Sequence, residues 1–185
     1  MKKIQISIAL LLCFFIMSAK AASNEELIIL VEHLLSLEQE RKFQGFSYFA
    51  KDKPAKKGWN KFICDQKDFN TFPPESYNTK TGIFTAPKDG FYRFSANGFI
   101  ATASINPDRI IIGIKVNGVL KSFSGGQFSA INTPAPQYTF IVKLKKGDKV
   151  SLTYDIPINA TFGNKINDGH EFWFQGEFIG QAQTK

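Results

Sequence analysis

The stretch YNTKTGIFTAPKDGFYRF, from Tyr77 to Phe94, indicates the fold more directly than any other segment of the chain. Three of its eighteen residues are phenylalanine and two are tyrosine, a density typical of a core, a binding platform or an assembly surface. Neighbouring side chains of an extended strand point to opposite faces. Tyr92 and Phe94 therefore share the face that we expect to be core, and Phe91 lies on the face that a single subunit would expose.

The alternation continues to Ile100, which places Phe99 on the outward face with Phe91 and makes the two phenylalanines candidates for subunit packing. Turn residues such as Asn117-Gly118 separate this run from later ones. Period-two patterns that recur between turn signals predict an all-β sandwich or barrel. The other alternating runs are Ile110–Val116, Tyr138–Leu144, Val150–Tyr154 and Phe172–Phe178.

Several positions that should face outward are apolar, although a sandwich with one solvated face carries mostly polar residues there. We therefore expect part of the outer surface to be covered, either by a neighbouring subunit or by loops of the same chain. These positions are Phe91, Phe99, Ile111, Ile141, Trp173 and Ile179.

Residues 1–21 follow the plan of a secretory signal peptide. Lys2 and Lys3 precede an apolar run from Ile4 to Met17, and Ala19-Lys20-Ala21 has the small residues of a cleavage site. The apolar run is shorter than the roughly 20 residues that a membrane-spanning helix needs. We expect cleavage after Ala21 and a secreted, extracellular protein that does not insert into membranes, with a retained anchor as the alternative.

A short amphipathic helix of the coiled-coil type is predicted over residues 23–42. Four leucines, Leu27, Leu30, Leu34 and Leu37, follow at the 3-4-3 spacing of heptad a and d positions. A helix of this length is marginal alone in water, so it has to pack on something. A self-associating stalk and a helix docked on the following domain are the two alternatives, and the leucines are candidates for subunit packing in the first.

Charge and cysteine content narrow the class of protein. Loss of residues 1–21 removes three lysines and leaves 20 basic against 16 acidic side chains, a balance too mild for a nucleic-acid-binding protein. Cys64 is then the only cysteine, so no disulfide forms within the chain. We predict that Cys64 is a small buried hydrophobe, with a disulfide between chains as the alternative.

The residues from Phe43 onward resemble the globular-head domain of complement component 1q, whose fold is shared with tumour necrosis factor. The family motif places an aromatic residue, then phenylalanine seven residues later, then glycine and x-Tyr-x-Phe, and the stretch from Tyr77 to Phe94 has all of them in register. The segment FQGEFI from Phe174 to Ile179 resembles a later strand. The family positions that we expect in the fold core are Tyr77, Phe84, Gly90, Tyr92, Phe94, Phe174 and Gly176.

This resemblance implies a ten-stranded jelly-roll sandwich over residues 43–182 that assembles as a homotrimer. Such heads are secreted, non-enzymatic modules for recognition or scaffolding. We therefore expect multivalent binding of a protein or a surface glycan. A structural building block of a surface or matrix, and a signalling ligand of the tumour-necrosis-factor type, are the alternatives.

The sequence offers few signs of chemistry. His33 and His170 lie far apart and outside any hydrolase motif, which favours a protein that is not an enzyme. We expect no cofactor; calcium stays an alternative because Ile105–Arg109 and Asn164–Glu171 place oxygen ligands in loops, although neither has a fixed-spacing calcium motif. Asn159 begins a glycosylation triplet that matters only in a eukaryotic secretory pathway.

A basic segment from Lys51 to Lys57 holds four lysines and is followed by Trp59. A solvated loop is the simpler interpretation, and contact with anionic glycans or nucleic acid is the alternative. Trp59 and Trp173 are candidate platforms for stacking on sugars, although a tryptophan within a strand pattern more often belongs to a core or an interface.

Overall fold

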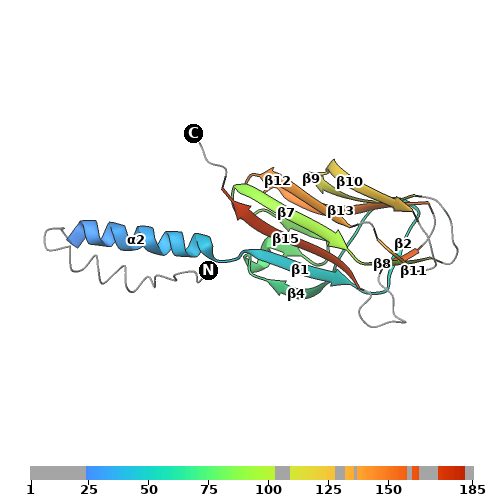
Figure 1. Ribbon diagram of the computed structural model, residues 1–185, viewed down its shortest axis with the longest axis horizontal. Coiled ribbons are helices and arrows are strands. Elements are labelled where there is room, and N and C mark those ends of the chain that lie inside the picture. The colour runs from blue at the N-terminus through green and yellow to red at the C-terminus, as the bar shows by residue number, and fades with distance from the viewer. Residues whose placement is uncertain are drawn as a thin grey trace, which may run out of the picture. The chain divides into compact units, whose positions relative to one another are not determined.

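The computed structural model of the protein describes residues 24–102, 109–127, 132–135, 137–157, 160–162 and 171–181. The chain divides into two compact units, Met1–Lys42 and Phe43–Lys185, and each is described by itself. The second unit, called the head below, contains all the strands of the described residues (Figure 1). The proposed signal peptide lies outside the described residues.

Helix α2 runs from Asn24 to Arg41, inside the range predicted for it. Of its four stripe leucines, Leu30 and Leu34 are half-buried. The side chains of Leu27 and Leu37 lie outside the described residues. In the described part of the chain, no helix combines the length and the apolarity of a membrane-spanning segment. Exposed apolar side chains of α2 are Ile28, Ile29, Val31 and Leu35.

The head is built from three antiparallel sheets. The five-stranded sheet has the order β12-β7-β15-β1-β4, formed by Tyr138–Leu144, Gly90–Asn97, Phe172–Gly180, Gly45–Ala50 and Gln66–Asn70. The six-stranded sheet has the order β10-β9-β13-β6-β5 with β3 added to β13, formed by Val119–Gln127, Arg109–Val116, Lys149–Ile156, Ile83–Thr85, Tyr77–Asn78 and Gly58–Lys61. The four-stranded sheet has the order β11-β8-β14-β2, formed by Asn132–Pro134, Phe99–Thr102, Ala160–Phe162 and Lys53–Ala55.

This arrangement confirms the predicted all-β sandwich of the jelly-roll type, preceded by a short helix. Strand numbering in the described residues reaches β15, beyond the ten strands that the resemblance implies, because several segments hold only two to four residues. One 3-10 turn, η1 from Pro74 to Ser76, leads into β5. In β7 buried and more exposed residues alternate along the whole strand, as the period-two pattern predicts.

Aromatic rings from both large sheets fill the core. Phe46 of β1 lies 5.1 Å from Phe84 of β6 and 5.3 Å from Phe174 of β15, measured between ring centroids. Phe84, Tyr92, Phe94 and Phe174 are fully buried. Burial raises the pKa of Tyr92 to about 12, although its hydroxyl donates a hydrogen bond to the Lys88 carbonyl. All seven residues that the resemblance assigns to the core are buried: Tyr77, Phe84, Gly90, Tyr92, Phe94, Phe174 and Gly176.

Cys64 is 1% exposed, which confirms the prediction of a small buried hydrophobe. Its thiol lies 3.6 Å from the Phe172 carbonyl oxygen. Burial, and next to it the negative charge of Asp65, raise the pKa of this thiol well above its usual value. The reactive thiolate is therefore strongly disfavoured in the folded head.

We expect the Cys64 thiol of the native protein to react with an aromatic disulfide reagent at least about 100 times more slowly than in the urea-unfolded chain. The cause is that both the solvent access and the thiolate fraction are lost on folding. Absorbance of the released thiolate measures the rate. Equal rates in the two states would show that Cys64 is accessible, and would reopen the possibility of a disulfide between chains.

Candidate functional site

The surface of the five-stranded sheet that points away from the core is the outer face of the head. Its central part is a polar ladder across three strands. Arg93 of β7 pairs with Glu177 of β15. Gln175 contacts Ser95 on one side at 3.4 Å and donates to the Ser47 hydroxyl on the other at 3.3 Å. These polar groups contact one another across three strands, and the charges of Arg93 and Glu177 are paired.

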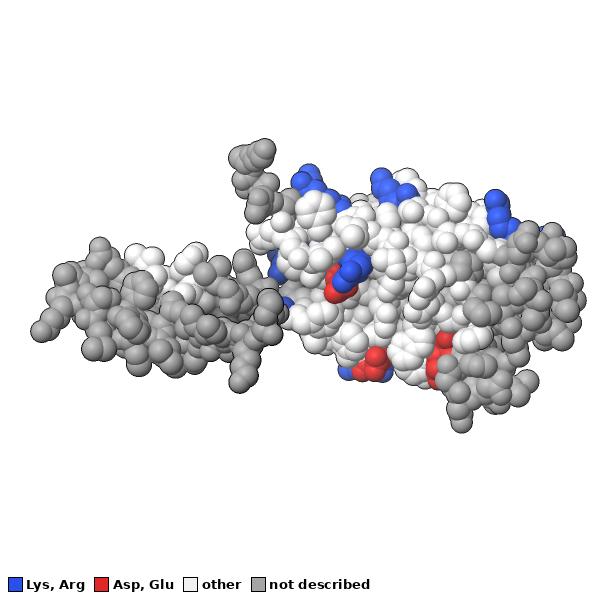
Figure 2. Space-filling model, in the orientation of Figure 1, with Lys and Arg blue, Asp and Glu red and all other residues white. Residues whose placement is uncertain are grey.

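Apolar side chains surround the ladder. At one end, Phe91 of β7 is 38% exposed and Ile179 of β15 is 46% exposed. Beside the ladder, Ile141 of β12 lies directly across from Arg93 and is 57% exposed. At the other end, the Phe49 and Trp173 rings lie 4.8 Å apart on neighbouring strands. Figure 2 shows that the surface over β7, β15 and β1 is mostly uncharged, with one basic and one acidic group side by side near its middle.

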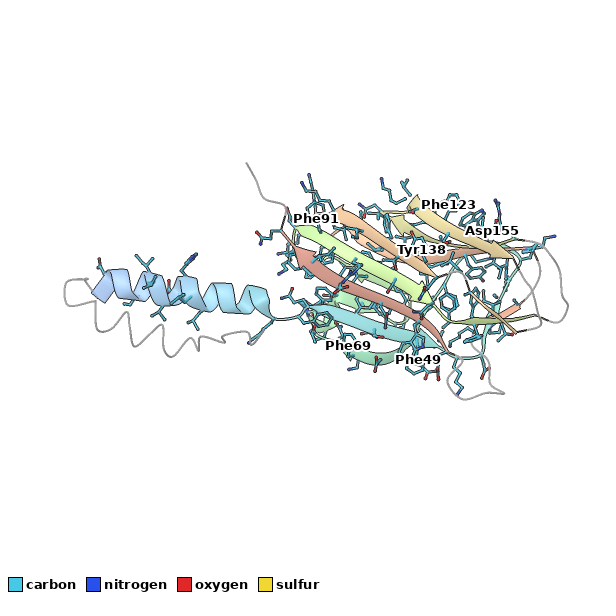
Figure 3. All side chains as sticks on the ribbon, in the orientation of Figure 1. Phe49, Phe69, Phe91, Phe123, Tyr138 and Asp155 are labelled. Atoms are coloured by element: carbon cyan, nitrogen blue, oxygen red, sulfur yellow. The ribbon has the colours of Figure 1, made fainter. Side chains whose placement is uncertain are left out.

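The lower margin of the outer face is also aromatic. Phe43 and Phe69 lie 6.0 Å apart and are 57% and 37% exposed. In Figure 3, Phe91 lies at one end of β7, and Phe49 and Phe69 lie along β1 and β4. Three strands of the five-stranded sheet, β7, β1 and β4, thus present aromatic side chains in one head.

A second apolar surface lies on β10, the edge strand of the six-stranded sheet. Leu120 and Phe123 are 37% and 57% exposed, and Val119 is 58% exposed. Leu120 and Phe123 close over Gly113 of β9, where an added Cβ would lie 3.0 Å from Leu120 and 3.2 Å from Phe123. In Figure 3, Phe123 lies on β10, away from Phe91, Phe49 and Phe69.

The structure separates the two phenylalanines that the alternation placed together. Phe91 lies on β7 in the outer face, but Phe99 begins β8 in the four-stranded sheet and is half-buried. Gly98 breaks the strand between them with φ of +145°, and its Cα approaches Glu171 and Phe172 so closely that an added Cβ would lie 2.5 Å from their backbone. The expectation of one continuous outward stripe is therefore wrong at Gly98.

Ile111, another position expected to face outward, is only 3% exposed. Residues of the same chain cover Ile111, so this position needs no neighbouring subunit to bury it. Trp173 is half-buried by packing against Phe49, whereas Trp59 on β3 is 46% exposed. Ile141 and Ile179 stay exposed, as their outward positions predict.

The structure describes few of the residues that the sequence suggested for calcium binding or glycosylation. Asn159, His170 and most of the two loops considered for calcium lie outside the described residues. Among the described residues, no cluster of three histidine, cysteine, aspartate or glutamate side chains could hold a metal ion. The leucines Leu30 and Leu34 belong to α2, in the other unit.

Sequence reasoning missed the β10 surface. Apolar and polar residues do not alternate regularly in the segment VLKSFSGGQ. In the structure, the register of β10 against β9 shifts between Leu120 and Ser122. The shift brings Leu120 and Phe123, which lie an odd number of residues apart, over the same glycine. The one sequence signal for this surface was Gly113, the glycine within the neighbouring apolar strand RIIIGIKV.

Comparison with known proteins identifies the fold and nothing narrower. No family profile matches the chain, and no curated protein matches its sequence. The globular domain of zebrafish complement 1qA protein matches with a TM-score of 0.53 and 18% identity, over 75% of this chain and 99% of that domain. A crystal structure of murine APRIL matches with a TM-score of 0.53 and 7% identity, over 74% of this chain and all of that one. The head therefore has the complement 1q and tumour-necrosis-factor type of jelly roll.

Proposed function

We propose that the protein is a secreted, non-enzymatic recognition module that assembles as a homotrimer and binds a protein or a surface glycan multivalently. The observation that carries this proposal is the pair of exposed apolar surfaces on one head, the outer face around Phe91 and the β10 surface around Phe123. The likeness to complement 1q and tumour-necrosis-factor heads supports the trimer, the secretion and the absence of catalysis.

Two different surfaces favour a ring over a two-fold dimer. When one patch of a subunit packs on a different patch of the next, the contact is heterologous and closes into a ring if the rotation permits. The outer face supplies a broad patch with a neutralised centre, and β10 supplies Leu120 and Phe123 as a narrow apolar edge. In a closed ring, the β10 surface of each subunit packs on the outer face of the next subunit. Every outer face and every β10 surface is then covered.

Helix α2 fits the role of a stalk in this assembly. Its exposed apolar side chains, Ile28 and Ile29 among them, have no partner within the described part of the helix that would cover them. Three such helices would bury these residues against one another. A stalk also raises the effective concentration of each head for the next, which strengthens the ring without a new contact.

A tethered set of three heads gains affinity when a surface presents repeated targets, because the second and third contacts form within one complex. This avidity distinguishes the proposed function from a purely structural one. A signalling ligand of the tumour-necrosis-factor type remains the further candidate, since murine APRIL shares the fold.

Replacing Phe91 with glutamate is expected to reduce the mass of the isolated head, residues 43–185, from three chains to one at micromolar concentration. The head is a compact unit with its own core, so the stalk does not mask the effect. Lys143 lies directly across from Phe91 on β12, and gives the new carboxylate a basic neighbour in the monomer. Light scattering measures the mass, and Phe91→Leu, which keeps an apolar side chain, is the control.

Replacing Phe123 with glutamate is also expected to reduce the mass of the isolated head from three chains to one, because Phe123 belongs to the β10 surface that packs on the outer face. An equimolar mixture of the two variants then retains one intact outer face and one intact β10 surface. It should form dimers with one chain of each kind. A mixture that stays monomeric, or a Phe123→Glu head that stays trimeric, would rule out this heterologous contact.

Arrays of glycans and of cell-surface proteins test recognition itself. The mature protein should bind at least one class of target. The isolated Phe91→Glu head should bind the same target with a lower apparent affinity than the unchanged isolated head, because avidity is lost. A trimer that binds nothing on such arrays would support the structural building block instead.

A further inference from the structure

A lysine-lined groove opens at the junction of the six-stranded and four-stranded sheets. Its volume is about 600 Å³, within the range of pockets that take small ligands. Lys53 comes from β2, Lys61 from the end of β3, and Lys80 from the turn between β5 and β6. We call this site the basic groove. Asp65 is the single carboxylate in its lining.

The positive charge of the basic groove is only partly neutralised. Lys53 and Asp65 form an ion pair with 2.5 Å between the ammonium nitrogen and the carboxylate oxygen. Lys61 and Lys80 are exposed, and no carboxylate of the described residues pairs with either of them. Two ammonium groups from distant parts of the chain therefore face one groove without a counter-ion from the described residues.

Local hydrogen bonds hold the wall that carries Lys80. The Asn78 side-chain oxygen accepts the backbone N–H groups of Lys80 at 2.9 Å and Thr81 at 3.0 Å. Gly82 closes the turn with φ of +63°, and an added Cβ would lie 2.8 Å from the Phe62 carbonyl oxygen. The turn is thus fixed close against the segment that follows β3.

The opposite wall is anchored to the core. The Phe62 N–H donates to the Leu152 carbonyl at 3.0 Å, and the Tyr77 hydroxyl donates to the Cys64 carbonyl at 3.0 Å. Asn60 donates from its side-chain nitrogen to the carbonyls of three residues in the preceding hairpin, at 2.9 to 3.3 Å. A groove with fixed walls loses little conformational entropy when it binds a ligand.

Neutral hydrogen-bonding groups also line the groove. The Tyr154 hydroxyl accepts the Lys56 N–H at 3.1 Å, which leaves its own proton to donate. Tyr154 and Thr79 both belong to the lining. Hydroxyl groups beside two uncompensated ammonium groups suit a ligand that carries hydroxyls as well as negative charges.

We infer that the basic groove binds an acidic saccharide, one whose sugar units carry sulfate or carboxylate groups. This inference deepens the proposed function, because it names the ligand class of a recognition module and rests on that function. Lys61 and Lys80 would contact the anionic groups, and Tyr154 and Thr79 would contact hydroxyls. A nucleic acid fits less well, since it needs a longer basic track and stacking rings, and the exposed Trp59 does not belong to the lining.

Binding of a heparin tetrasaccharide to the mature protein tests the inference. Calorimetry at physiological salt should detect binding to the unchanged chain. Reversing Lys61 and Lys80 together, K61E with K80E, should lower the affinity about 100-fold, since each charge-assisted contact is worth about a factor of ten or more. The control reverses two exposed lysines elsewhere in the head, K67E with K149E, and changes the net charge equally. It should lower the affinity less than about threefold.

Four results would overturn the inference. They are no binding of the tetrasaccharide to the unchanged protein, an equal loss in the control pair, unchanged binding after removal of the sulfates together with reduction of the carboxylates, and equally tight binding of a single-stranded oligonucleotide of the same charge. Circular dichroism and light scattering confirm that both double variants keep the fold and the trimer. A trimer that binds array targets but not the tetrasaccharide would refute the groove while leaving the proposed function intact.

Discussion

Replacing Phe94 with alanine is expected to lower the free energy of unfolding by about 3–5 kcal/mol, because a fully buried ring is lost and leaves a cavity. Phe94 has no exposed surface. Its ring centroid lies 5.5 Å from that of Phe84 and 5.9 Å from that of Phe174, so it joins the two large sheets. These neighbours belong to strands held in register on both sides, which limits how far the cavity can collapse.

Urea unfolding of the isolated head carrying Phe123→Glu, which we expect to be monomeric, measures this loss at one fixed protein concentration. Phe91→Ala, three residues earlier on the same strand, is the matched control. It removes the same ring from the outer face, so within one head we expect it to cost less than about 1 kcal/mol. Equal losses in the two variants would mean that Phe94 is no more part of the core than Phe91, and the assignment of faces along β7 would be wrong.

Replacing Gly176 with alanine is expected to lower the free energy of unfolding by about 2–3 kcal/mol, because one added methyl group overpacks the aromatic core. An added Cβ would lie 2.4 Å from Cε1 and 2.7 Å from Cζ of Phe46, and 2.9 Å from Cδ1 of Phe94. Both rings are buried and lie close to other aromatic rings, so neither has free space to move into.

Gly125→Ala is the control for this prediction. Gly125 lies on β10, where an added Cβ would have its nearest contact at an ordinary 3.4 Å. We expect its effect on urea unfolding to stay within about 0.5 kcal/mol. If Gly176→Ala were as mild as Gly125→Ala, the packing of the Phe46 and Phe94 rings against position 176 would not exist as described.

The aromatic core was predictable from sequence because it depends on local alternation. Tyr92 and Phe94 occupy every second position of one strand, and a strand places such positions on one face whatever its neighbours are. The match of the stretch around them to a known head domain added Tyr77 and Phe84, which lie on other strands. Their burial needs only that these strands pair as they do in that fold.

The surfaces were less predictable because they depend on breaks in the pattern. Alternation placed Phe99 with Phe91, but a chain bend at Gly98 moves Phe99 into another sheet. The β10 surface arises from a register shift beside Leu120, which no single-strand pattern contains.

The basic groove needed the tertiary structure altogether. Lys61 and Lys80 are separated by the whole of β4, η1 and β5, and neither belongs to a basic run in the sequence. The basic segment noticed in the sequence, Lys51–Lys57, contributes Lys53 and Pro54 to the lining, and that lysine is paired with Asp65.

The mass of the mature chain, residues 22–185, tests the central claim most directly. Light scattering at micromolar concentration should give three times the mass of one chain, because assembly as a trimer covers the outer face and the β10 surface of each head. A mass equal to one chain would contradict the proposed assembly. The exposed aromatic residues of the outer face would then belong to a monomer.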